Sequence, residues 1–102
     1  MGREAKDYSK ACIYIITTNG GCYVGSTNNF NRRKIEHRRS IYNSKYRNYN
    51  SLICQKIREN NGEWCMQNFK NFPCNNKKEL EDEERKWINK LNSTCNKNMK
   101  DR

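Results

Sequence analysis

The 102-residue sequence has one proline, one histidine and no long uninterrupted run of apolar residues. A helix that crosses a membrane needs about 20 consecutive apolar residues, so the sequence offers no transmembrane candidate. Only 33% of the residues are hydrophobic, but they recur at strand and helix spacing, which favours a folded chain over a disordered one. We expect one small domain over residues 11–98, with an N-terminal extension over residues 1–10 and a C-terminal tail over residues 99–102.

Paired metal-binding cysteines are also missing. The six cysteines form no CxxC pair, and a single histidine leaves the usual zinc arrangements without their spacing. The charged first ten residues lack the apolar core of a signal peptide. We therefore expect reduced, structural cysteines in a protein that is not secreted and works inside the cell, in the cytoplasm or the nucleus. A secreted, disulfide-linked domain is the alternative.

Acidic residues are few, with 11 Asp and Glu against 21 Lys and Arg and a formal net charge of +10. This surplus favours a polyanionic partner, because each phosphate that a protein neutralises releases counterions. A membrane partner is not expected, since no segment combines high basicity with a strongly apolar face. A basic surface that serves solubility alone is the alternative.

Residues 12–26 predict a β-hairpin. Residues 12–18 are rich in β-branched and aromatic side chains, and residues 22–26 continue in the same style. Between them, Asn19-Gly20 is the strongest short hairpin signal.

The hairpin also predicts which side chains share a face. If its loop holds an even number of residues, Tyr14 and Ile16 lie on the same face as Tyr23 and Gly25. Two phenols then share one surface, and the glycine opposite Tyr14 leaves space above it.

A basic helix is predicted next. Residues 27–29, Thr-Asn-Asn, are typical of a helix start. At helical spacing His37 falls on the apolar face that begins with Phe30. Arg33 lies at the margin of that face, one turn from His37, whereas Arg32 points away.

The remaining elements complete an α+β fold. An apolar pattern that starts at Leu52 predicts a second helix, ended by Asn60-Asn61-Gly62. Residues 63–72 alternate Trp64, Met66 and, less regularly, Phe69, which predicts a third strand. Because a lone hairpin is only marginally stable, we expect a small three-stranded antiparallel sheet flanked by about three helices.

The last helix is predicted over residues 77–92. Its expected apolar stripe consists of Leu80, Trp87, Ile88 and Leu91. Glu84 lies near the middle of that stripe, whereas Glu83 and most of the other acidic residues point elsewhere and favour the helix dipole. An unpaired buried carboxylate costs several kcal/mol. A metal ion, hydrogen bonds, or a salt bridge to Arg33 or Lys34 must therefore compensate Glu84.

These residues together resemble the GIY-YIG nuclease domain over about residues 11–96. The resemblance rests on Ile13-Tyr14, Tyr23-Val24-Gly25-Ser26, Arg33, His37 and Glu84. The match has two departures: Cys12 stands where the first motif usually has glycine, and Val24 replaces the isoleucine of the second motif.

The resemblance implies a metal-dependent endonuclease that hydrolyses DNA phosphodiester bonds by a one-metal mechanism, with one Mg²⁺ (or Mn²⁺) per active site. It implies that Glu84 holds the metal and that Arg33 contacts the scissile phosphate. The expected partner is duplex or branched DNA, with a homodimer or a protein partner that supplies targeting. A catalytically inactive nucleic-acid-binding module is the alternative.

For the proton transfers, the resemblance implies that Tyr14, or Tyr23 instead, holds or deprotonates the attacking water. A tyrosine with an ordinary pKa of about 10 is a poor base at neutral pH, so it would need help from a cation such as Arg32. His37 is implied to orient the tyrosine or the phosphate, with a hydrogen-bonded core histidine as the alternative.

Further contacts to nucleic acid are predicted at polar and basic side chains. Residues 40–50 interleave tyrosines with basic residues, which suits phosphate contacts and base stacking, although a solvated helix end and loop is the alternative. The residues predicted to contact nucleic acid are Ser26, Arg32, Lys34, Arg38, Arg39, Lys45, Arg47 and Tyr49. Ser26 could instead cap the basic helix. Asn96 and Asn98 stand near the place where relatives carry an asparagine close to the site, without a firm assignment.

Overall fold

A computed structural model describes residues 7–93, 95 and 96. Along the chain it contains β1 (Cys12–Thr18), β2 (Gly21–Thr27), α1 (Phe30–Tyr42), α2 (Leu52–Glu59), β3 (Cys65–Asn71) and α3 (Lys77–Leu91). The predicted α+β fold class is confirmed. Asn98, the predicted tail and most of the predicted N-terminal extension lie outside the described residues. Within the described part of the chain, no helix is both long and apolar enough to cross a membrane.

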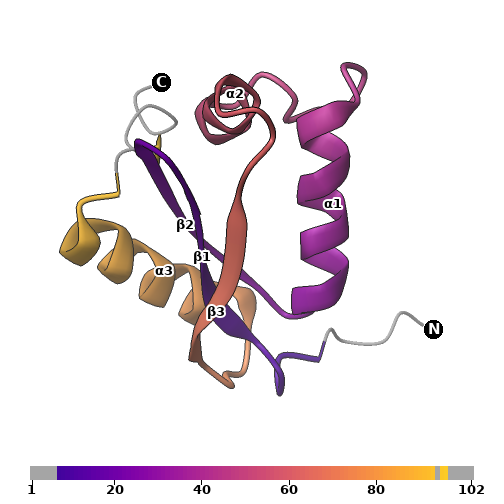
Figure 1. Ribbon diagram of the computed structural model, residues 1–102. Coiled ribbons are helices and arrows are strands. Elements are labelled where there is room, and N and C mark those ends of the chain that lie inside the picture. Colours follow the sequence, from indigo (N-terminus) through magenta and orange to yellow (C-terminus); the bar gives the residue numbers. More distant parts are fainter. Residues whose placement is uncertain (1–6, 94, 97–102) are drawn as a thin grey trace.

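The three strands form an antiparallel sheet in the order β2-β1-β3 (Figure 1). The hairpin turn is Asn19-Gly20, and Gly20 has a φ of 84°, a value that glycine adopts without strain. Tyr14 pairs with Gly25 and Ile16 with Tyr23, as the even loop predicted. Because β1 is central, β2 lies at one edge of the sheet.

The helices cover both faces of the sheet. Figure 1 shows α3 on one side and α1 and α2 on the other. On the face of α1 and α2, Tyr14 and Ile16 pack with Ile41 and Ile57. On the opposite face, Leu80 and Ile88 of α3 pack with the buried side chains of Ile13 and Val24. A side chain from α3 and one from α1 can therefore meet only around an edge of the sheet.

Local sequence signals account for the helix starts. Asn29, Ser51 and Asn76 are the N-caps of α1, α2 and α3, and each side chain accepts a backbone N–H of the first turn. After α2, Asn61 and Gly62 adopt positive φ angles of 63° and 80°, as expected for residues that end a helix.

Two apolar side chains of the predicted elements are exposed in the structure. A register shift in β3 pairs Tyr14 with Asn68 and Ile13 with Lys70, so Phe69 is the extra residue between them and is 41% exposed. Its ring packs against Trp87, with 4.9 Å between the ring centroids. Leu91, in the last turn of α3, is 39% exposed rather than part of a buried stripe.

Candidate active site

A cavity of about 330 Å³, called the edge cavity below, lies beside β2. Strands β1 and β2 and helices α1 and α3 all contribute to it. Of the predicted site residues, it is lined by Tyr14, Tyr23, Ser26, Arg32, Arg33 and Glu84. The fold therefore brings together residues from both faces of the sheet at one edge.

Gly25 and Ser26 on β2 explain how the two faces meet. A Cβ on Gly25 would lie 2.4 Å from the Tyr14 Oη atom, so the phenol occupies the space that the missing side chain leaves. Ser26 points to the opposite face, where its Oγ donates a hydrogen bond to Glu84 Oε1. Gly25→Ala would push the phenol away from this position.

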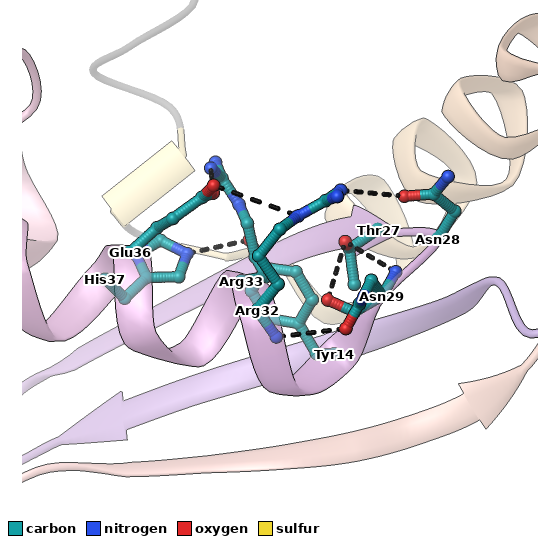
Figure 2. A network of polar contacts seen from close by, with 8 residues as sticks. All are labelled: Tyr14, Thr27, Asn28, Asn29, Arg32, Arg33, Glu36 and His37. Carbon is teal, nitrogen blue, oxygen red and sulfur yellow. Dashed lines mark hydrogen bonds and ion pairs between the residues drawn. The ribbon is translucent and has the colours of Figure 1, made fainter. Parts of the chain in front are cut away.

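Tyr14 is fully buried and belongs to a polar group shown in Figure 2. Its hydroxyl lies 2.8 Å from His37 Nε2, and Arg33 Nε donates to the same oxygen at 3.3 Å. Burial, together with the charge of Arg33, lowers the pKa of His37 to about 4. At neutral pH the imidazole is therefore uncharged, and its Nε2 can accept the phenol proton.

Both tyrosines stay protonated at neutral pH in this structure. Burial is the main cause that raises the pKa of both Tyr14 and Tyr23. The neighbouring Tyr23 also raises the pKa of Tyr14, and the negative charge of Glu84 raises the pKa of both phenols. The rings are neighbours, with centroids 6.3 Å apart. A pre-formed phenolate is therefore not available as the base.

The cation beside the phenol is Arg33 and not Arg32, contrary to the suggestion from sequence. Arg33 is half-buried and its Nη1 also donates to Glu36 Oε1 at 2.9 Å. Arg32 is directed elsewhere, with Nη2 3.1 Å from Asn28 Oδ1 and 59% of its side chain exposed. Figure 2 shows the two guanidinium groups in these different positions. The offset of 100° per residue in a helix separates them.

Glu84 reaches the edge cavity from α3. Burial raises the pKa of its carboxyl group, and the hydrogen bond from Ser26 opposes that rise. Among the described residues Glu84 forms no salt bridge to Arg33 or Lys34, so that predicted alternative is wrong. The cap role considered for Ser26 is also wrong, because Asn29 caps α1.

The donor set of the cavity suits a hard cation. Glu84 and, one turn before it, Glu81 line the cavity with carboxylate oxygens. Across the described residues, no cluster of three or more His, Cys, Asp or Glu side chains forms a closed metal site. Mg²⁺ keeps several of its waters and is commonly held by one or two carboxylates plus phosphate oxygens, so these residues fit it.

Glu83 is a buried carboxylate that the sequence did not reveal. It is only 9% exposed, accepts from Lys70 Nζ and Trp87 Nε1 at 2.8 Å each, and lies 3.7 Å from Lys86 Nζ. The hydrogen bond from Lys70 is the main cause that lowers its pKa. The prediction that Glu84 alone faces inward is therefore wrong. The sequence did hold one signal for this: Trp87 lies four residues after Glu83, one helical turn away, where its indole N–H can reach the carboxylate.

The predicted nucleic-acid contacts occupy different surroundings. Arg38, Arg39, Lys45 and Arg47 are exposed, and Lys34 is half-buried. Tyr49 is half-buried, and one face of its ring is covered by the Arg58 guanidinium, 3.8 Å from the ring centroid. Stacking of a base on that face of Tyr49 would require Arg58 to move.

Asn96 has a structural role that the sequence did not assign. Its Oδ1 accepts from Val24 N at 2.7 Å and its Nδ2 donates to Val24 O at 2.9 Å. These two bonds satisfy backbone groups on the outer edge of β2, beside Tyr23 and Gly25. Asn96 therefore helps to fix the strand that carries the site.

Comparison with models of protein families gives a match to the model described as the GIY-YIG catalytic domain, over residues 10–99. Comparisons with curated proteins and with solved structures gave no match.

Proposed function

This chain belongs to the GIY-YIG catalytic domain family, a family of nucleases, and on that premise we propose that it is a metal-dependent DNA endonuclease. The observation that carries the proposal is the meeting of Glu84 with Tyr14 and Arg33 at the edge cavity. These groups come from opposite faces of the sheet. Among the residues that the structure describes, Glu84 has no salt-bridge partner, so packing alone gives no reason for a carboxylate at this position.

Arg33 is proposed to bind the scissile phosphate. Its guanidinium uses one donor on Tyr14 and one on Glu36, and a guanidinium has five N–H donors in all. The remaining donors can hold phosphate oxygens. Donors held in place before the reaction stabilise the extra negative charge of the transition state without having to reorganise.

Tyr14 and His37 are proposed to remove the proton of the attacking water. As the water oxygen forms its bond to phosphorus, its proton passes to the Tyr14 oxygen and the Tyr14 proton passes to His37 Nε2. His37 ends this step as the imidazolium, and Tyr14 remains a neutral phenol. This route avoids a phenolate, which burial disfavours. Tyr23 lines the same cavity and is the alternative base.

Glu84 is proposed to hold one Mg²⁺ or Mn²⁺. A bound divalent cation would favour the ionised carboxylate that burial disfavours. Such an ion stabilises the charge on the leaving oxygen of a phosphodiester. The hydroxyl of Ser26 orients the carboxylate toward the cavity.

The test is incubation of the protein with duplex, single-stranded, flap and branched DNA, with Mg²⁺ or with a chelator, and separation of the products by length. We expect new ends only with the metal. The alternative, an inactive module, predicts binding to the same DNA with no cutting by the wild type. Cutting that is lost in Glu84→Gln while binding persists would exclude that alternative, and cutting that persists with chelator would contradict the metal requirement.

We also propose that the protein works inside the cell, where its six cysteines, all free in this structure, remain reduced.

We further propose that a second copy of the chain or a protein partner supplies targeting. A monomer that selects its substrate alone would contradict this proposal.

A further inference from the structure

A second cavity, called the loop cavity below, also borders Arg33. Its volume is about 420 Å³, and Arg33 and Glu36 line it as well as the edge cavity. The segment that follows α1 contributes Lys45, Tyr46, Arg47 and Asn48. Arg33 is therefore a shared wall between the proposed cleavage site and a basic hollow.

The charges around the loop cavity favour an anion. Lys45 and Arg47 are exposed, and within the described part of the chain neither forms an ion pair. Glu36 is the carboxylate on its wall, and it already contacts Arg33 at 2.9 Å and Arg32 at 3.9 Å. Two basic side chains without an ion pair face a hollow whose one acidic group is paired, so a phosphate is the ligand that this chemistry suits.

The segment that carries Lys45 and Arg47 is held by the protein. Arg58 donates from Nη1 to Ile41 O at 2.8 Å and from Nη2 to Tyr49 O at 2.7 Å, so it joins the two ends of the segment. Within the segment, Tyr46 N donates to Asn43 O at 2.9 Å. A site built on an ordered backbone loses less conformational entropy when a ligand binds.

We infer that the loop cavity binds a second, uncut phosphate of the DNA strand whose scissile phosphate lies on Arg33. The inference rests on the proposed function and adds the direction in which the strand leaves the site. One strand carries a phosphate about every 3.4 Å of helix axis, and Arg33 lines both cavities, so the second phosphate is expected within the first few phosphates from the cut. Lys45 and Arg47 neutralise that phosphate, and Tyr46 and Asn48 lie where they can contact its sugar or base.

The test uses DNA in which one phosphate at a time is replaced by an uncharged methylphosphonate. With wild-type protein we expect no cutting at the neutral phosphate itself. We also expect cutting to drop about tenfold at one further bond, which lies a fixed number of nucleotides from the neutral phosphate and is called the offset. In Lys45→Ala/Arg47→Ala the drop at that offset should disappear. The control Lys78→Ala/Lys90→Ala removes two exposed positive charges from α3, and neither lysine lines either cavity. The control should therefore still show the drop at the offset. A drop at the offset that persists in Lys45→Ala/Arg47→Ala would overturn the inference.

A binding measurement separates this inference from the proposed function. In chelator, where no cutting is expected, the slope of log K against log salt should fall by about two for Lys45→Ala/Arg47→Ala and change little for the control. If the wild type never cuts, the proposed function fails and the binding result still decides the inference. Equal changes in slope for both double variants would overturn it. Thermal unfolding should show that both double variants are folded, because all four side chains are exposed.

Discussion

Glu83 and Glu84 are adjacent and identical, yet the protein treats them differently. The Glu83 carboxylate accepts hydrogen bonds from Lys70 and from the indole N–H of Trp87, and Lys86 lies close to it. These groups lower its pKa. Glu84 accepts a hydrogen bond from Ser26, and burial raises its pKa. Glu83 is buried and Glu84 is half-buried, and the fold supplies cations to Glu83 but presents Glu84 to a cavity.

The difference separates two uses of a shielded carboxylate. A buried charge whose partners are all present tends to support the fold, because removal of one partner leaves an uncompensated charge. A shielded charge whose compensation is incomplete costs stability and is retained where a ligand completes it. Arg32 and Arg33 show the same contrast on α1, with one guanidinium at the surface and the other on the Tyr14 hydroxyl.

The largest expected effect is on cleavage by the two glutamate variants. Glu84→Gln should lower the rate about 1000-fold, because it removes the proposed metal ligand, whereas Glu83→Gln should stay close to wild type. The measurement is the initial rate of cutting of the best substrate at saturating Mg²⁺. Equal losses in the two variants would mean that the comparison reports only on stability.

The next effect tests the arginines. Arg33→Ala should lower cleavage about 100-fold or more, because the transition-state charge loses its donors. Folding should change little, since Tyr14 keeps its bond to His37. Arg32→Ala removes a charge that lines the cavity but does not touch Tyr14, so its loss should be smaller. Normal cutting by Arg33→Ala would remove it from the phosphate.

His37 extends the comparison to a buried neutral group. Its pKa is about 4 in the fold and about 6.5 when unfolded, so the unfolded state binds more protons between these values and stability falls as pH falls. The loss should be about 2 to 3 kcal/mol from about pH 7 to about pH 4. Urea unfolding at several pH values checks this, with His37→Gln as the reference because it lacks the titrating imidazole. The shifts of Glu83 and Glu84 are shared by both proteins and cancel. Parallel curves would show that the histidine is not buried in its neutral form.

Stability should distinguish the glutamates in the opposite order to cleavage. Glu83→Gln should lower the free energy of unfolding by about 1 to 2 kcal/mol at neutral pH, because Lys70 and Lys86 lose their shared carboxylate. The value is modest because Lys70 is 40% exposed. Glu84→Gln should equal or slightly exceed wild type, since it removes a shielded charge. Urea unfolding without metal measures both, and a larger loss in Glu84→Gln would contradict the assignment.

The smallest expected effect is stabilisation by the metal. At a Mg²⁺ concentration of about five times its dissociation constant, the wild type should gain about 1 kcal/mol. Glu83→Gln should keep this gain and Glu84→Gln should lose it, as read from thermal unfolding with and without Mg²⁺. A gain that persists in Glu84→Gln would place the ion elsewhere.

By itself, the sequence determined the local elements and one half of the site. The Asn19-Gly20 turn sets the pairing of Tyr14 with Gly25, and the caps and apolar spacing set α1 so that Arg33 and His37 face Tyr14. These features depend on neighbours within a few residues or on a two-residue loop, so periodicity and turn chemistry suffice to predict them.

Only the tertiary structure decided which groups compensate which charges. Lys70 lies 13 residues from Glu83, Ser26 lies 58 from Glu84, and Asn96 lies 72 from Val24. A helical wheel reports which direction a side chain takes but not what it meets there, and it therefore missed the burial of Glu83. The placement of β3 beside β1 left β2 at an edge, and that edge is where residues from both faces of the sheet come within reach of one substrate.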